Sequence, residues 1–108
     1  MKYIYIAGPY TNPDPVINTR SAIEAGDIVA ELGYYPYTSH LTLFWNLVAP
    51  HKISFWYQHD LAWLEKCDAL IRLPGTSSGA DKEVDYATEL KIPVFFGLES
   101  FMKGRKDA

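Results

Sequence analysis

Residues 68–90 read DALIRLPGTSSGADKEVDYATEL, and this stretch decides the fold. The apolar run at 68–73 predicts a strand, buried apart from Arg72, that ends in a turn rich in glycine and serine. A helix follows from about Gly79, and the next apolar run, IPVFFGL, predicts another strand before a short terminal helix. A helix between two buried strands is typical of a parallel sheet covered by helices.

The same alternation extends toward the N-terminus. The run KYIYIAG predicts a buried first strand. An amphipathic helix follows at 16–32, with Asp14 as N-cap and Gly33 at its end. Its apolar side is expected to hold Ile17, Ala22, Ala25, Ile28, Val29 and Leu32.

Between the first helix and residues 68–90, YYPYTSH at 34–40 predicts an edge strand, because Pro36 does not fit a central strand. The aromatic segment 41–54 is typical of an irregular loop that covers a site, and 55–66 has helical period. The order predicts an α/β fold: a three-layer open parallel sheet, flavodoxin- or Rossmann-like, with four to five strands. Ligands of such sheets bind beyond the carboxyl ends of the strands.

Composition limits the function classes. The 108 residues are 48% hydrophobic and 15% aromatic, which fits a single domain over 1–108. A net charge of -3 argues against duplex nucleic acid as a partner, because only the short tail KGRKDA is basic. The lone Cys67 fits a reducing cytoplasm. We expect no membrane span and no secretory signal, and so a cytoplasmic protein.

Two carboxylates fall on the apolar sides of their helices. At about 100° per residue, Glu83 lies among Ala80, Val84, Ala87 and Leu90. Asp60 likewise lies within the arc formed by Trp56, Tyr57, Leu61, Trp63 and Leu64. Each acid caps a loop or pairs with a buried cation such as Arg72, or the two form a functional pair. Paired carboxylates in separate environments are what glycosidic bond cleavage uses.

The turn TSSG before the second helix suits an anion, because hydroxyls and backbone N–H groups meet there at a helix N-terminus. A plain N-cap is the alternative. The turn lacks the Gly-Lys-Ser/Thr ending of a Walker loop, so we exclude a nucleoside triphosphatase of that type.

With these residues in view, the chain resembles the nucleoside 2-deoxyribosyltransferase superfamily, most closely its 2'-deoxynucleoside 5'-phosphate N-hydrolases. The likeness is strongest in DLAWLEKCDALIRLPGTSSGADKEVDYA, residues 60–87. An acid precedes Leu-x-Trp-Leu, a Cys-Asp pair opens the strand, and a Ser-x-Gly turn is followed by a glutamate. YIYIAGPY and YTSH resemble the family's first strand and the histidine-bearing end of its second.

The resemblance implies that Glu83 is the nucleophile at C1' of the sugar. Asp60 would orient a sugar hydroxyl or the nucleophile, or assist the leaving base, and Tyr5 would hydrogen-bond near Glu83. The implied substrate-binding residues are Gly8, Pro9, Tyr10, His40, Ser77, Ser78 and Gly79. No cofactor and no metal are implied, and Asp68 is expected to fix the strand entry rather than take part in chemistry.

The implied function is an N-glycosidase, a hydrolase of nucleotide metabolism that cleaves (deoxy)nucleoside 5'-monophosphates and acts as a homodimer. The alternatives are deoxyribosyl transfer, or a non-catalytic nucleotide-binding or sensor module of the same fold. A lysine-decarboxylase-like phosphoribohydrolase fits less well, because the turn lacks a second glycine pair. A small interaction domain could instead use Phe44, Trp45, Phe55 and Trp56 as a dimer interface.

The chain departs from the N-hydrolase pattern in three places. GPYTNPDP replaces a loop rich in glycine and arginine, and KEVDYA replaces Tyr-Glu-Leu-Gly. The serine that a neighbouring subunit lends to the phosphate site in that branch has only Ser100 as a candidate.

Overall fold

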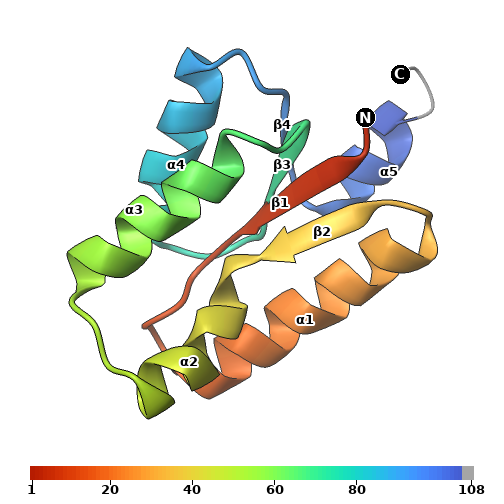
Figure 1. Ribbon diagram of the computed structural model, residues 1–108. Coiled ribbons are helices and arrows are strands. Elements are labelled where there is room, and N and C mark those ends of the chain that lie inside the picture. Colours follow the sequence, from red (N-terminus) through yellow and green to blue (C-terminus); the bar gives the residue numbers. More distant parts are fainter. Residues whose placement is uncertain (106–108) are drawn as a thin grey trace.

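Four parallel strands form one sheet in the order β2-β1-β3-β4 (Figure 1). The computed structural model describes residues 1–105, so Lys106 to Ala108 of the predicted basic tail lie outside the described residues. The strands are β1 (Tyr3–Ala7), β2 (Tyr35–Thr38), β3 (Ala69–Arg72) and β4 (Val94–Phe96). The helices are α1 (Pro15–Glu31), the 3-10 helix η1 (Ser39–Leu41), α2 (Thr42–Val48), α3 (Ile53–Leu64), α4 (Ser78–Glu89) and α5 (Leu98–Gly104).

Helices cover both faces of the sheet, which confirms the predicted three-layer α/β fold. Side chains alternate along β1, so Ile4 and Ile6 pack on one face while Tyr5 and Ala7 pack on the other. The first face is completed by α1 and α5 through Ala22, Val29 and Phe101. The second is completed by α3 and α4 through Leu64, Ala80 and Ala87. Figure 1 shows α3 and α4 together on one side of the sheet.

Strands are added on one side of β1 first and on its other side afterwards, so the strand order reverses between β1 and β3. From β1 the chain moves to β2 at one edge, whereas β3 and β4 extend the sheet the other way. The loops after β1 and β3 approach closely, since a Cβ on Gly8 would lie 3.0 Å from Leu73 Cβ. Gly75 has φ +117°, and a Cβ there would lie 2.7 Å from Pro9 Cγ. Open α/β sheets bind ligands at such a switch point.

Three local expectations were wrong. Residues 41–54 are not an irregular loop, because η1 and α2 make most of the segment helical. Arg72 is buried, with 8% of its surface exposed, because loop carbonyls surround its guanidinium. In α1, Ile17 and Ile28 are 61% and 43% exposed, since the small residues Ala22, Ala25 and Gly26 make the close contact instead.

Among the helices that start at the carboxyl end of the sheet, α1 and α4 are capped by side chains. Asp14 Oδ1 accepts hydrogen bonds from the backbone N–H groups of Val16 at 2.8 Å and Ile17 at 3.2 Å. Ser77 Oγ accepts from Ala80 N at 3.1 Å and so starts α4. None of the helices in residues 1–105 is long and apolar enough to cross a membrane.

Candidate active site

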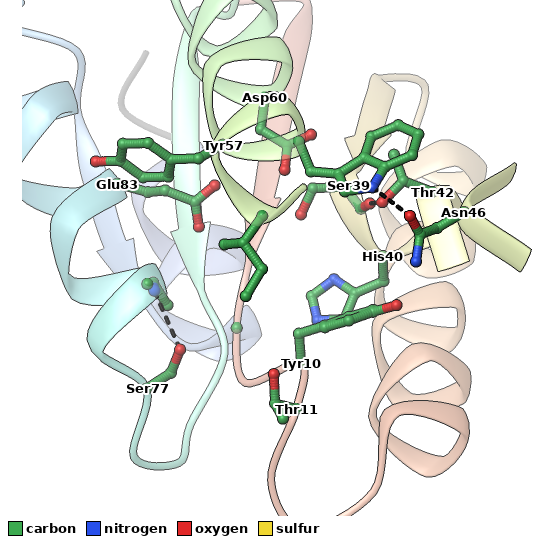
Figure 2. Close-up of a pocket in the computed structure, with 15 residues that line it drawn as sticks. Tyr10, Thr11, Ser39, His40, Thr42, Asn46, Tyr57, Asp60, Ser77 and Glu83 are labelled. Carbon is green, nitrogen blue, oxygen red and sulfur yellow. Dashed lines mark hydrogen bonds between the residues drawn. The ribbon is translucent and has the colours of Figure 1, made fainter. Parts of the chain in front are cut away.

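A cavity of about 300 Å³ opens at the carboxyl ends of the strands (Figure 2). Its walls come from the loop after β1, from η1 and α2, from α3, and from the start of α4. The lining residues are Gly8, Tyr10, Thr11, Ser39, His40, Thr42, Asn46, Ile53, Trp56, Tyr57, Asp60, Ser77, Gly79, Ala80 and Glu83.

Glu83 turns inward from α4, as its helical phase predicts, and is 8% exposed. The hydroxyl of Tyr5, a fully buried residue of β1, donates a hydrogen bond to Glu83 Oε2. Burial raises the pKa of Glu83 to about 7; the Tyr5 hydrogen bond and Arg72 oppose the shift, while Asp60 adds to it. Glu83 is therefore a poorly solvated carboxyl group that faces an open cavity and is held by a phenol.

Asp60 lines the same cavity from α3. Tyr37 of β2 donates its hydroxyl to Asp60 Oδ1 at 3.1 Å. Burial raises the pKa of Asp60 to about 7, and the hydrogen bond from Tyr37 lowers it. Near neutral pH each acid is therefore partly protonated, and ionisation of Asp60 disfavours that of Glu83. One carboxylate and one carboxylic acid can thus coexist in the cavity.

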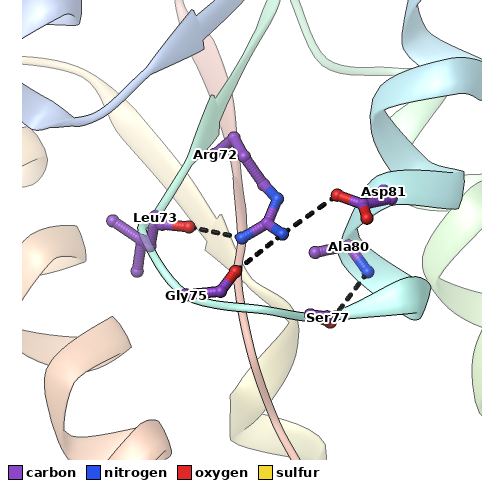
Figure 3. Close-up of polar contacts among 6 residues, drawn as sticks. All are labelled: Arg72, Leu73, Gly75, Ser77, Ala80 and Asp81. Atoms are coloured by element: carbon purple, nitrogen blue, oxygen red, sulfur yellow. Dashed lines mark hydrogen bonds and ion pairs between the residues drawn. The ribbon is translucent and has the colours of Figure 1, made fainter.

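Arg72 forms its hydrogen bonds and its ion pair with the turn after β3 and with the start of α4 (Figure 3), and not with Glu83. Its guanidinium donates to the carbonyl oxygens of Leu73 and Gly75 and to Asp81 Oδ1, the last at 3.0 Å. These contacts fold the turn that carries Ser77 toward the cavity. Since none of the fifteen lining residues is a lysine or arginine, Glu83 and Asp60 lie in a cavity without a cationic side chain on its wall.

The expected anion site is only partly assembled. Ser77 and Gly79 line the cavity, whereas Ser78 does not and is exposed. Ser77 Oγ accepts from Ala80 N, so this hydroxyl serves as the helix cap. Figure 2 shows that bond at the lower edge of the cavity. An anion at this turn would therefore be bound by backbone N–H groups and by the remaining capacity of the Ser77 hydroxyl.

The loop after β1 contributes two of the three residues expected from it. Gly8 and Tyr10 line the cavity, but Pro9 does not. Pro9 packs against Gly75, and its carbonyl oxygen lies 2.8 Å from His40 Nε2. Pro9 therefore connects the loop after β1 to the turn after β3 and to η1.

His40 is both buried and part of the wall, with 2% of its surface exposed. Burial lowers its pKa, so the ring is neutral near pH 7. The carbonyl oxygen of Pro9 can only accept, which places the proton on Nε2 and leaves Nδ1 as an acceptor. That Nδ1 has no hydrogen-bond partner among residues 1–105.

Several lining residues were not predicted. Thr42, Asn46 and Ile53 belong to the segment expected to be a covering loop, and Trp56 was expected at an interface. Only the aromatic content of this segment pointed to a site wall. Tyr37, which holds Asp60, carries no signal of its own in the sequence.

Other titratable residues have structural roles. Asp68, expected to fix the entry of the strand that it precedes, accepts through Oδ2 from Lys2 N at 2.7 Å and Tyr3 N at 2.9 Å, so it links the entry of β3 to the start of β1. These bonds lower the pKa of Asp68. Cys67 is buried on the face of the sheet that α3 and α4 cover, and burial raises its pKa to about 11. Within residues 1–105 no group of three His, Cys, Asp or Glu side chains is placed to hold a metal ion.

Comparisons with known proteins address the family and the fold. A family model described as a domain of unknown function (DUF7768) matches residues 2–97. None of the curated proteins matches the chain. Among solved structures, the chain is similar to a 2-deoxyribosyltransferase from the psychrotolerant bacterium Bacillus psychrosaccharolyticus, with a TM-score of 0.67 and 18% sequence identity. The match covers 86% of this chain and 69% of that one, and at this identity it shows a shared fold.

Proposed function

This chain belongs to the family described as a domain of unknown function (DUF7768), and from its site we propose that it is an N-glycosidase of (deoxy)nucleoside 5'-monophosphates. One observation carries the proposal. Glu83 is a buried carboxyl group that opens onto a cavity, accepts from Tyr5, and shares that cavity with a second acid. Two carboxyl groups that face one cavity suit cleavage of a glycosidic bond, one as nucleophile and one as proton donor.

The ionised Glu83 would attack C1' of the sugar. The bond from C1' to the base nitrogen breaks, its electron pair leaves with the base, and an ester forms between Glu83 and the sugar. Asp60 in its acid form donates a proton to the departing base. Water then attacks C1', Asp60 takes up the proton, and Glu83 is released as a carboxylate. A pKa of about 7 for each acid suits this exchange of protons.

The start of α4 supports a monophosphate as substrate. Ser77 and Gly79 line the cavity at the N-terminus of a twelve-residue helix. Ala80 N and Asp81 N are bonded to Ser77, whereas the backbone N–H groups of Ser78 and Gly79 have no partner among the described residues. Free N–H groups at a helix N-terminus bind phosphate well, which offsets the lack of a basic side chain on the wall.

Transfer of the sugar to a second base is the alternative favoured by the structural likeness, because that neighbour is described as a 2-deoxyribosyltransferase. In that case a base would replace water in the second step. A binding module would use the same cavity without turnover. Adding a second free base separates transfer from hydrolysis, and tight nucleotide binding without base release identifies the module.

The experiment is to incubate the protein with a panel of nucleosides and nucleoside 5'-monophosphates and to measure free base by chromatography. Wild type should release base, and Glu83→Ala should lower kcat by at least about a hundredfold, since the nucleophile is lost. Glu89→Ala is the matched control, because Glu89 is an exposed acid of the same helix. Equal base release by Glu83→Ala and wild type would show that the mechanism is wrong.

We also propose that the protein acts as a homodimer. Large apolar side chains are exposed on α2 and at the start of α3, beside the cavity. They include Phe44 at 73%, Leu47 at 69%, Val48 at 71% and Ile53 at 87% exposure. An apolar surface of this kind marks an association site.

A further inference from the structure

Asn46 has a fixed amide orientation. Its Oδ1 accepts from Trp56 Nε1 at 2.7 Å and from His51 N at 3.0 Å. An indole N–H and a backbone N–H can only donate, so the atom between them is the oxygen. The amide nitrogen of Asn46, which can only donate, is thereby directed away from both.

That nitrogen is an available donor on the cavity wall. Asn46 lines the cavity, and within residues 1–105 its Nδ2 has no hydrogen-bond partner and is not buried from solvent. In Figure 2 the amide nitrogen of Asn46 lies toward His40, whereas the amide oxygen is the atom that accepts from the indole N–H of Trp56. Because the oxygen is held at two points, Nδ2 is positioned before any ligand arrives, which favours selective recognition.

His40 places an acceptor on the same wall. Its neutral ring carries a proton on Nε2, bonded to the carbonyl oxygen of Pro9, and its buried Nδ1 lacks a partner. A buried acceptor without a donor costs free energy, which an N–H group of a ligand would recover. A wall with one donor and one acceptor complements a ligand edge that has an acceptor beside a donor.

The wall formed by η1 and α2 lies across the cavity from α4. Figure 2 shows Glu83 and Ser77 on one side and Thr42 and Asn46 on the other. A nucleotide with C1' at Glu83 and its phosphate at Ser77 would therefore direct its base toward Trp56 and Asn46. This placement rests on the proposed function.

We propose that Asn46 reads the base and selects bases in which a carbonyl oxygen adjoins a ring N–H. Uracil, thymine, hypoxanthine and guanine present that edge. Cytosine and adenine present an amino group beside an unprotonated ring nitrogen. With these bases the amino group, a donor, would lie opposite the amide nitrogen of Asn46, which is also a donor. The unpaired donors would then disfavour these two bases.

The test uses Asn46→Asp, which is nearly isosteric. One carboxylate oxygen can still accept from Trp56 and His51, so the contacts that hold α2 to α3 persist, while the donor is replaced by an acceptor. Gln58→Glu adds the same charge at an exposed position of α3 and serves as the control. Thermal unfolding of both variants shows whether each is folded.

Two substrate pairs differ only at the edge in question: the 5'-monophosphates of deoxyuridine and deoxycytidine, and those of deoxyinosine and deoxyadenosine. Wild type and Gln58→Glu should favour the carbonyl member of each pair by at least about tenfold in kcat/KM. Asn46→Asp should abolish or reverse that ratio. An unchanged ratio in folded Asn46→Asp, or no preference in wild type, would overturn the assignment.

Equilibrium binding separates this inference from the proposed chemistry. The same four nucleotides are titrated into Glu83→Gln protein, with and without Asn46→Asp, by calorimetry. A carbonyl preference in Kd that Asn46→Asp reverses supports base reading by Asn46 even if wild type releases no base. Base release with a preference that Asn46→Asp leaves unchanged would keep the glycosidase and remove the role of Asn46. No binding of any nucleotide would overturn both.

Discussion

Tyr5 and Tyr37 lie side by side on neighbouring strands, and each donates its hydroxyl to a different acid of the cavity. They are register partners in β1 and β2, with stacked rings whose centroids are 5.4 Å apart. Tyr5 holds Glu83 and Tyr37 holds Asp60. Tyr37 also stacks on Trp63 at 5.5 Å. One aromatic stack therefore positions both acids relative to the sheet.

Tyr37→Phe should impair the acid step while leaving the stack in place. The Tyr37 hydrogen bond lowers the pKa of Asp60, so its loss should raise that pKa further above about 7. If protonated Asp60 is the acid, the alkaline limb of kcat should move to higher pH and kcat should fall by about tenfold. The pH dependence of base release measures both effects. The control is Tyr35→Phe, because Tyr35 is an exposed tyrosine on the same strand. An unshifted pH profile of base release in Tyr37→Phe would contradict the role of Asp60 as the acid.

Glu83 should make the fold less stable as pH rises. Its folded pKa of about 7 lies above the value of an exposed glutamate, so the folded state binds more protons between about pH 4 and pH 7. The stability that protonated Glu83 adds is fully present at a pH below the pKa of Glu83 in the unfolded chain. It is lost as the pH rises through the pKa of Glu83 in the folded protein. The free energy of unfolding of wild type should drop by on the order of 2–3 kcal/mol relative to Glu83→Gln between about pH 5 and pH 8.

Urea unfolding of both proteins across that range measures the difference. His40 acts in the opposite direction, since burial lowers its pKa, but it is present in both proteins and cancels in the comparison. Parallel curves for wild type and Glu83→Gln would show that Glu83 titrates in the folded protein as it does in the unfolded chain.

Arg72→Met should destabilise the protein more than Asp81→Asn. The buried guanidinium holds two carbonyl oxygens of the turn, and these would lose a charged donor. We expect a loss of about 2–4 kcal/mol, with weaker nucleotide binding because the turn carries Ser77. Asp81 is 69% exposed, so its loss should cost less than about 1 kcal/mol. Denaturant midpoints compare the two variants, and equal losses would contradict this account.

The inward position of Glu83 could be predicted from the sequence because it depends only on the phase of one helix. The apolar positions Ala80 and Ala87 define the buried face of α4, and Glu83 lies between them. The parallel sheet and the location of the cavity beyond its carboxyl ends followed from alternation of strands and helices, which depends on burial of apolar runs.

The partners of the acids could not be predicted in this way. The bond from Tyr37 to Asp60 depends on the register of β2 beside β1 and on the position of α3 above them. The α2 helix gave little signal, because it has seven residues, no side-chain N-cap bond and no buried residue. The position of Asn46 depends on the contact between α2 and α3 at Trp56, which no local sequence pattern specifies.

Leu47→Glu should weaken self-association of the protein. The segment 41–50 contains no charged residue, and Phe44, Leu47 and Val48 are each at least 69% exposed on α2. An uncharged apolar patch can face its own copy without like-charge repulsion, as a two-fold dimer requires. Sedimentation velocity should show a dimer for wild type and a shift toward monomer for Leu47→Glu, because a buried unpaired carboxylate is costly.

Met102→Glu is the matched control, since Met102 is a partly exposed apolar residue on α5, which Figure 1 places at the end of the molecule opposite α2. It should sediment as wild type does. Because Ile53 lines the cavity and is 87% exposed, a dimer through this surface would also cover part of the cavity rim. Leu47→Glu should then raise KM more than it lowers kcat. A monomeric wild type, or a dimer insensitive to Leu47→Glu, would place association elsewhere and leave the rim open to solvent.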